Sequence, residues 1–346
     1  MFAIAALVGP RNWEGLSMTR HFFLLLVFGL VLGHGSASFA ADAASMKLSD
    51  GFDGTDFDPK GGLYYRKNAE QAAGTATFQS EVKRTGAGAL KLSVKSLCPP
   101  TDDLCSERAE IWERTKLRVP YSKGVWDGFA VKFGDPIPTD DHRYLIAQWK
   151  REIGPNTKGD FSPFLALRVR NGKLFATVES NFQPGIPATK TDKGLSCPAG
   201  LTRVWLRPDT NQMRTLVAYD EQWTDADAGE FDSCTDKLTV TSHGAPLPTP
   251  QSGWIDFAIY SQPGPDGTGH IEVFANGTWV ITVKGFIGHN DKGLGTNQYF
   301  KFGPYRAGRE GTWTLYYDDF RRSPDCIDVL GDAGLCLQVA QQVAKE

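Results

Sequence analysis

The sequence lacks an excess of charge of either sign. Its 346 residues include 37 Lys and Arg against 40 Asp and Glu, which gives a formal net charge of −3. Composition therefore predicts that the protein does not bind nucleic acid, and any cationic site must be local. The sequence also lacks a phosphate-binding loop and a Ser-His-Asp signature, the usual marks of nucleotide-dependent enzymes and serine hydrolases.

No hydrophobic run is long enough to span a bilayer, which takes about 20 residues. The run from Phe22 to Leu32 follows Arg20, and the small residues Ser38 and Ala40 flank a cleavage point before Ala41. This pattern is typical of an export signal. We predict that residues 1–40 are an upstream extension and a signal peptide that starts at Met18; a membrane anchor is the alternative. The mature protein would be secreted or periplasmic and free of the membrane.

The six cysteines lack the CxxC and Cys/His spacings of zinc sites. All six lie after the predicted signal, as expected for an exported chain with disulfides. The simplest pairing joins neighbours in the sequence, although other pairings stay open. It predicts Cys98–Cys105, Cys197–Cys234 and Cys326–Cys336.

Long helical periodicity is missing except in the tail "LCLQVAQQVAKE". The rest consists of short β-like runs separated by Gly, Pro, Asn and Asp. "RNGK" and "ANGT" place Asn-Gly between alternating runs, which predicts β-hairpins. We therefore predict an all-β jelly-roll sandwich of two antiparallel sheets over residues 41–325, with a concave substrate groove. Residues 326–346 would form a disulfide loop and a short C-terminal helix.

Several strands pair an apolar face with a polar one, because successive strand residues point to opposite sides. The expected polar-face residues are Arg108, Glu110, Trp112, Arg114, His142, Tyr144, Gln148, Lys150, Arg168, Arg170, Lys301 and Tyr305. A solvated outer face is the simplest explanation. The aromatic members Trp112, Tyr144 and Tyr305 favour a groove in which rings contact a ligand. Placing Tyr305 on the polar face assumes that no bulge occurs at Gly303-Pro304. Alternation along the strand that holds Gln148 also places Ile146 on the polar face.

The segments "ERAEIWER", "YLIAQWK" and "FKFGPYR" resemble three strand motifs of jelly-roll polysaccharide lyases. The likeness is to the heparin lyase I-like and glucuronan lyase-like group, with alginate lyases more distant, and it covers about residues 48–322. That group carries Arg-x-Glu, Gln-x-His and Lys-x-Gly-x-Tyr strands across a concave sheet. The resemblance implies a lyase that cleaves a uronic-acid-containing polysaccharide, such as glucuronan or mannuronate-rich alginate, by β-elimination.

The resemblance also implies a role for each matching residue. Arg108 and Gln148 would neutralise the uronate carboxylate, which makes the C5 proton removable. Glu110 would orient Arg108 or serve only as a charge partner in the sheet. Tyr305 would take the C5 proton and protonate the departing O4. Lys301 and Arg306 would place positive charge nearby, and no cofactor would be required.

One position departs from the pattern, because Lys150 stands where the group has histidine. A lysine can neutralise the substrate carboxylate, but it is a poor base unless it is strongly desolvated. His142 is six strand residues from Gln148, or about 20 Å, so we do not expect it to fill the gap. His270 and His289 remain candidates from other strands.

Two other classes of protein stay open. A glycoside hydrolase needs two facing carboxylates, whereas Glu110 and Glu113 are expected on opposite faces. A non-catalytic carbohydrate-binding module would keep Trp112, Trp149 and the basic residues without needing Tyr305.

The predicted partner is an acidic polysaccharide, and we expect a monomer. A structural calcium ion is the metal that the sequence suggests, because carboxylates cluster near both ends of the predicted domain. Its ligands would be Asp50, Asp53, Asp318 and Asp319.

Overall fold

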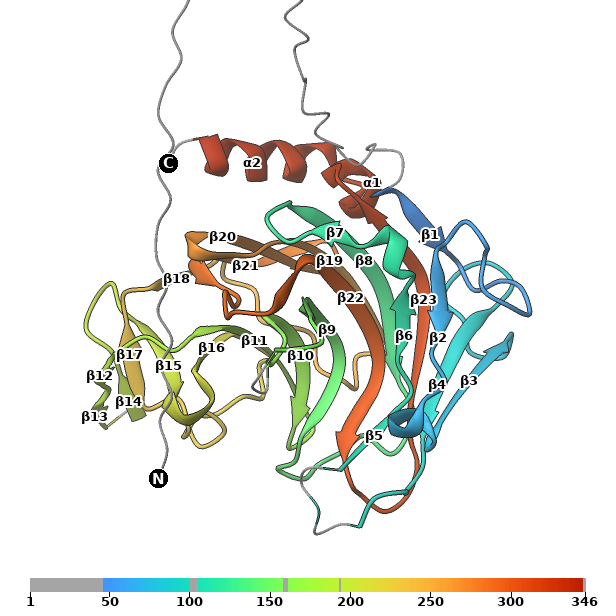
Figure 1. The fold of residues 1–346 in the computed structure, drawn as a ribbon, viewed down its shortest axis with the longest axis horizontal. Helices are drawn as coiled ribbons and strands as arrows, with labels where there is room; N and C mark the ends of the chain where they lie inside the picture. The colour runs from blue at the N-terminus through green and yellow to red at the C-terminus, as the bar shows by residue number, and fades with distance from the viewer. Residues whose placement is uncertain (1–45, 100–101, 103–104, 158–160, 193, 345–346) are drawn as a thin grey trace, which may run out of the picture. The chain divides into compact units, whose positions relative to one another are not determined.

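The computed structural model describes residues 46–99, 102, 105–157, 161–192 and 194–344. The predicted signal segment, residues 1–40, lies outside the described residues. The unit that spans residues 41–346 contains two large antiparallel sheets that face each other (Figure 1). The predicted all-β sandwich is therefore confirmed.

The first sheet has nine strands, in the order β18-β21-β20-β19-β8-β23-β4-β3 with β1 beside β23. Its strands are β1 (Leu48–Asp50), β3 (Gly74–Gln79), β4 (Ala89–Val94), β8 (Val125–Phe133), β18 (Leu238–Ser242), β19 (Trp254–Gln262), β20 (Gly264–Ala275), β21 (Thr278–Ile287) and β23 (Trp313–Ser323).

The second sheet has twelve strands, in the order β12-β17-β15-β16-β11-β10-β9-β22-β6-β2, with β5 and β7 beside β22. Its strands are β2 (Leu63–Tyr65), β5 (Ser106–Arg108), β6 (Ile111–Glu113), β7 (Val119–Pro120), β9 (Tyr144–Ile153), β10 (Leu165–Arg170), β11 (Lys173–Asn181), β12 (Ile186–Pro187), β15 (Thr202–Arg207), β16 (Gln212–Tyr219), β17 (Ser233–Thr235) and β22 (Leu294–Ala307). A separate hairpin pairs β13 (Thr189–Thr191) with β14 (Gly194–Ser196).

Aromatic side chains fill the space between the two sheets. Phe129 of β8 lies 5.6 Å from Phe300 and 6.1 Å from Phe302 of β22, measured between ring centres. The indole of Trp149 donates to Asp127 Oδ2 across the same layer, at 2.8 Å. Trp149 is therefore a buried core residue and not a ring that contacts sugar, because its strand parity points it between the sheets.

The two Asn-Gly hairpins form as predicted. Asn171 and Gly172 both have positive φ and leave Arg170 paired with Lys173, and Asn276 and Gly277 do the same between β20 and β21. Two successive positive φ angles define the hairpin turn that matches the twist of antiparallel strands. The first of these hairpins holds β10 and β11 side by side in the second sheet.

A β-bulge changes which residues of β9 share a face. Opposite β22, Ala147 pairs with Phe302 and Leu145 pairs with Tyr305, so the pairing skips one residue of β9 and two of β22. The expectation that Ile146 shares the polar face with Gln148 is therefore wrong, and so is the assumption of an unbulged Gly303-Pro304. Ile146 packs in the core, and its carbonyl oxygen accepts a 2.6 Å hydrogen bond from Tyr317.

The chain folds the tail onto the outer side of the first sheet. Helices α1 (Cys326–Leu330) and α2 (Ala333–Ala344) follow β23, and Val329 and Val339 pack with Trp126. Part of the predicted disulfide loop is thus helical. All three predicted disulfides form, namely Cys98–Cys105, Cys197–Cys234 and Cys326–Cys336.

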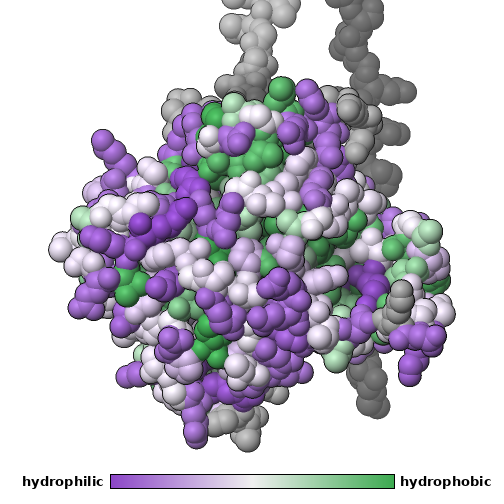
Figure 2. Space-filling model, turned by 180° about the vertical axis from the view of Figure 1, so that it is seen from behind, coloured by the Kyte–Doolittle hydropathy of each residue, from purple (hydrophilic) through white to green (hydrophobic). Residues whose placement is uncertain are grey.

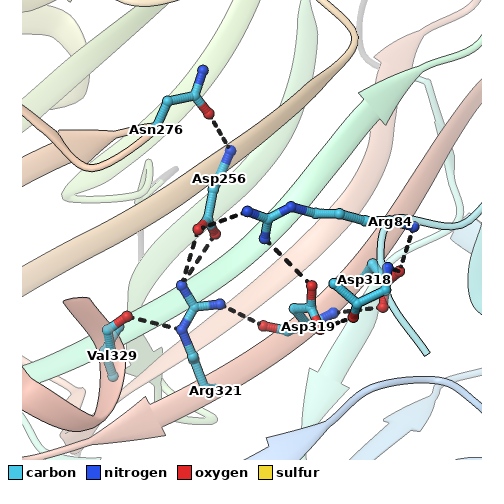
Figure 3. A network of polar contacts seen from close by, with 8 residues as sticks. Arg84, Asp256, Asn276, Asp318, Asp319, Arg321 and Val329 are labelled. Carbon is cyan, nitrogen blue, oxygen red and sulfur yellow. Dashed lines mark hydrogen bonds and ion pairs between the residues drawn. The ribbon is translucent and has the colours of Figure 1, made fainter. Parts of the chain in front are cut away.

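A polar network ties a loop, the first sheet and the tail together (Figure 3). Arg84 contacts Asp256 and Asp319, and Arg321 reaches both Asp256 and the carbonyl oxygen of Val329. Asp318 Oδ2 accepts the backbone N–H groups of Arg84 and Thr85. The carboxylates of Asp256, Asp318 and Asp319 therefore contact donor groups of the protein itself.

The other two aspartates considered as calcium ligands are placed in the same way. Asp50 accepts the backbone N–H groups of Phe52 and Asp58, and Asp53 accepts those of Ala87 and Gly88. In the described part of the chain, no group of three or more His, Cys, Asp or Glu side chains is arranged to hold a metal ion. The described helices also include none with the length and apolarity needed to cross a membrane.

The molecular surface is mostly polar on the face drawn in Figure 2. Hydrophilic residues cover most of that face, and hydrophobic residues gather in several patches between them.

Candidate active site

A cleft of about 380 Å³ lies across β9, β10, β15, β16 and β22 of the second sheet. Its described lining contains two acidic residues, Asp141 and Glu230, against seven basic ones, although the whole chain is slightly acidic. The basic residues are Arg108, Arg143, Lys150, Arg168, Arg170, Arg207 and Arg214. Positive charge concentrated in a concave site attracts a polyanion.

Tyr305 lies in this cleft between two arginines. It pairs with Arg108 across β22 and β5, and the Arg108 guanidinium carbon is 4.0 Å from the centre of the phenol ring. The guanidinium carbon of Arg143 is 5.2 Å from the same centre. Both guanidinium groups therefore lie within cation–π distance of the phenol ring.

Glu110 connects the predicted site residues beneath the cleft. Its carboxylate accepts a hydrogen bond from Gln148 Nε2, lies 2.7 Å from Lys301 Nζ and lies 3.7 Å from an Arg108 nitrogen. Glu110, Gln148 and Lys301 are each 1% exposed. Glu110 therefore fixes the orientation of the two groups that were expected to meet a uronate carboxylate.

Ionisation in this group follows from burial and from the neighbouring charges. Burial lowers the pKa of Lys301 to about 8, in spite of the opposing effect of Glu110. Burial also acts to lower the pKa of Arg108, but Glu110 and Tyr305 raise it further, so the net shift is upward. Arg108 stays charged, as a donor to a carboxylate must.

Gly303 allows the strands to approach closely at this point. It has a φ of 130°, and a Cβ there would overlap the carbonyl oxygen of Ala109 and press on the Glu110 Cα. A glycine is required because L side chains rarely adopt this conformation. The bulge at Gly303-Pro304 thereby sets Tyr305 beside Arg108 while Lys301 stays beside Gln148.

The sequence predicted Arg168 and Arg170 as substrate-binding residues, and both line the cleft. Arg168 is buried and contacts Glu179, which Arg214 also contacts at 2.7 Å. Arg170 forms ion pairs with Asp141 and Glu230. Both arginines are therefore held in place by carboxylates, and each adds a fixed positive group to the wall.

Four other predicted site residues have different surroundings. The Trp112 ring stacks on Tyr299 and lies 4.3 Å from Lys301 Nζ, so protein groups already contact it. Arg114 is exposed, because β6 ends at Glu113 and Arg114 precedes a short 3₁₀ helix. Arg306 forms a buried ion pair with Glu107. Tyr144 lines the cleft edge, but its ring packs on Trp313.

Lys150 and one histidine line the cleft. Lys150 is half-buried. Of the histidines weighed from the sequence, His142 lines the cleft near Arg143 and Leu145. His270 belongs to the first sheet and contacts Glu272 at 2.5 Å. His289 is buried behind Phe161, a residue of the cleft wall.

Sequence reasoning set His142 aside as a base. It also missed the basic and aromatic lining residues Arg143, Trp205, Arg207 and Arg214. A signal existed for two of them, since Trp205 and Arg207 alternate with buried Val204 in "TRVWLRP". His142 was set aside by its distance from Gln148, but Tyr305 pairs with Leu145 near the other end of β9.

The glycoside hydrolase alternative needs Glu110 and Glu113 to face one sugar. Glu113 instead accepts the backbone N–H of Phe300 and pairs with Arg322 between the sheets, whereas Glu110 lies under the cleft. The two carboxylates point to opposite sides of the second sheet, as alternation predicts.

The fold and the cleft define a jelly-roll protein with a cationic groove across one sheet. Residues 55–321 match the polysaccharide lyase family, so the chain belongs to that family and is a polysaccharide lyase. No curated protein sequence matches the chain.

The chain is similar to solved structures, and the first of them shows the fold. The endo-β-1,4-glucuronan lyase of the fungus Trichoderma reesei is similar, with a TM-score of 0.52 and 17% identity over 83% of this chain and 98% of that one. The cellulose-induced protein Cip1 has a TM-score of 0.42 and 15% identity, over 80% of this chain and 97% of that one.

Proposed function

We propose that this lyase cleaves a uronic-acid-containing polysaccharide by β-elimination, with Tyr305 as both base and acid. The observation that carries the proposal is the grouping of Tyr305, Arg108 and Gln148 in a cleft whose lining is rich in arginine, with Glu110 beneath it. The uronate carboxylate would lie against Gln148 and Arg108. An amide N–H and a guanidinium both donate to carboxylate oxygens.

The proposed reaction moves one proton. The Tyr305 oxygen, in its phenolate form, takes the C5 proton of the uronate, and the charge left at C5 is stabilised on the carboxylate by Gln148, Arg108 and Lys150. The C4–O4 bond then breaks, a C4=C5 double bond forms, and Tyr305 returns its proton to O4. No cofactor takes part in this scheme.

The polymer is proposed to be glucuronan first and mannuronate-rich alginate second. The similar fold of a glucuronan lyase supports the first choice. Three disulfides suit a protein that works outside the cytoplasm, where we propose that it acts as a monomer.

The experiment is a screen of the purified protein on glucuronan, alginate, heparin and hyaluronan. Elimination produces an unsaturated sugar that absorbs in the ultraviolet, and its products carry no added water. Hydrolysis adds water to each product. Mass spectrometry of the products separates the two reactions. The proposal would be contradicted if none of the four polymers is cleaved, or if the products carry added water.

A further inference from the structure

The end of the cleft farthest from Tyr305 contains a compact cationic group. Trp205 pairs directly with Arg214 across β15 and β16. The guanidinium carbons of Arg207 and Arg214 lie 4.8 and 5.1 Å from the centre of the Trp205 ring. Arg207 Nη1 also donates to the side-chain oxygen of Gln212 at 2.5 Å. The ring and the amide thus hold two guanidinium groups at one place in the wall.

The charge at this end favours an anion. Glu179 is fully buried, and it is shared by Arg168 and Arg214, whose nitrogens lie 3.2 and 2.7 Å from Oε1. The Glu179 carboxylate thus forms ion pairs with two guanidinium groups. Arg207 places a third guanidinium group nearby. Burial acts to raise the pKa of Glu179, but the two arginines outweigh it and the net shift is downward, so Glu179 stays ionised. The lining of the whole cleft holds seven Arg and Lys side chains against two acidic ones, so positive charge is in excess there.

This group is too far from the proposed reacting centre to touch the same sugar. Tyr305 is on β22 and Trp205 is on β15, with β9, β10, β11 and β16 between them. Neighbouring strands are about 4.8 Å apart, so the two positions are separated by roughly 24 Å along the sheet. A polysaccharide that crosses the strands would cover that distance with several sugar units.

We propose that Trp205, Arg207 and Arg214 form a second anion-binding subsite, which takes the carboxylate of a uronate several units away from the cleaved bond. This inference rests on the proposed function and adds a requirement for chain length. Arg binds carboxylates through paired donors, and its ring contact with Trp205 limits the entropy lost on binding. Binding remote from the reacting atoms lets a long chain hold its scissile uronate against Gln148 and Arg108. The enzyme therefore cleaves long chains within their length and cleaves short oligomers poorly.

The test compares Arg207→Ala with the wild type on glucuronan oligomers of defined length, or on oligomers of whichever polymer is cleaved best. Arg207 is chosen because loss of Arg214 would remove an ion-pair partner from the buried Glu179 carboxylate. We expect kcat/KM on long oligomers to fall about tenfold, the usual effect of one charge-assisted hydrogen bond. On the shortest oligomer that is cleaved, the change should stay within about twofold. Arg207→Lys should recover part of the loss, and Trp205→Ala should resemble Arg207→Ala.

The matched control is Lys190→Ala, which removes an exposed positive charge from β13, outside the cleft. It should leave both rates unchanged. Equal loss on short and long oligomers in Arg207→Ala would overturn the proposal by placing Arg207 at the reacting centre. No loss on either would overturn it by showing that no subsite exists.

Binding separates this inference from the proposed reaction. Calorimetric titration with a long glucuronan oligomer compares the Tyr305→Phe protein with the Tyr305→Phe/Arg207→Ala double variant. Weaker binding by the double variant supports the subsite, even if the screen finds no elimination. Equal binding by the two, or no binding by either, overturns it.

Discussion

The guanidinium carbon of Arg108 lies 4.0 Å from the centre of the Tyr305 ring, and the two residues are direct partners across β5 and β22. This contact brings a permanent cation to the hydroxyl that is proposed to transfer the proton. It depends on the bulge at Gly303-Pro304, which two residues of β22 form opposite β9. The position of the phenol is therefore set by backbone geometry as well as by sequence.

Tyr305→Phe should abolish turnover and leave the fold and polymer binding largely intact, because only a hydroxyl is lost. The measurement is the rate of unsaturated product, with circular dichroism and a binding titration alongside. Tyr219→Phe is the control, since Tyr219 is an exposed tyrosine of β16 that does not line the cleft. Near-normal turnover in Tyr305→Phe would remove Tyr305 from the reaction.

Gln148→Ala should reduce kcat by about 10²-fold or more if its amide stabilises charge on the uronate carboxylate. Arg108→Ala should have an effect of the same size, for the same reason. Steady-state rates on the best polymer provide the measurement. Gln262→Ala, a change on β19 of the first sheet, should leave kcat as it is. A loss confined to KM in Gln148→Ala would assign the amide to binding alone.

Glu110→Ala should destabilise the protein by about 3–5 kcal/mol, because it leaves the buried Lys301 ammonium without its ion-pair partner. Urea denaturation measures this loss. The double variant Glu110→Gln/Lys301→Met removes both charges and should restore most of the stability. Its kcat should stay low, because Gln148 and Arg108 lose the carboxylate that orients them.

Recovery of kcat together with stability in that double variant would show that Glu110 acts on the fold only. The buried pair of Arg306 and Glu107 gives a comparison outside the cleft. Arg306→Met/Glu107→Gln should change stability without a specific effect on kcat.

Asp127 should make the protein more stable at pH 5 than at pH 8. It is fully buried beside Trp149, and burial raises its pKa to about 7. The folded protein therefore holds a proton that the unfolded chain has already lost, and the associated stability falls as pH rises to about 7. From pH 5 to 8 the loss is about 2 to 3 kcal/mol.

The measurement is urea denaturation of the wild type and of Asp127→Asn at both pH values. The variant keeps an acceptor for the Trp149 indole and should lose this part of the pH dependence. The neighbouring ion pair of Glu113 and Arg322 is unchanged and serves as an internal reference. An identical pH dependence in both proteins would show that Asp127 is already ionised at pH 5.

The sequence was sufficient to predict the β-sandwich, because hairpin turns and the alternation of apolar and polar residues are local signals. Asn171-Gly172 and Asn276-Gly277 form the predicted turns, and the cysteines pair with their neighbours in the sequence. The grouping of Arg108, Gln148 and Tyr305 also followed from motif resemblance. These features depend on short-range spacing, which a single sequence records.

What the sequence could not supply was register. A bulge shifts the pairing of β9 and β22 by one residue, so Tyr305 lies opposite Leu145 instead of Tyr144, and Arg143 contacts the Tyr305 ring. The contacts of Trp112 depend on which strands lie opposite, a matter of long-range pairing. A shift of one residue reverses the face of every later side chain, so alternation alone fails beyond a bulge.

The position of Lys150 bears on substrate stereochemistry. The motif resemblance implies a histidine at this position, and this chain has a half-buried lysine there, so we expect one tyrosine to take the C5 proton and to protonate O4. A single group reaches both only when they lie on the same side of the sugar ring. That is the case in β-D-glucuronate and β-D-mannuronate, and it is not the case in the C5 epimers L-guluronate and L-iduronate.

We therefore expect kcat/KM to be higher on glucuronan and polymannuronate than on polyguluronate or iduronate-rich heparin. Lys150→His tests the cause, because a histidine at this position adds a second base and should raise the rate on polyguluronate relative to polymannuronate. Lys150→Gln removes the charge without adding a base and serves as the control. A clear wild-type preference for polyguluronate would mean that a second base is already present. His142, which lines the cleft, would then be the first residue to replace, with Gln as the substitute.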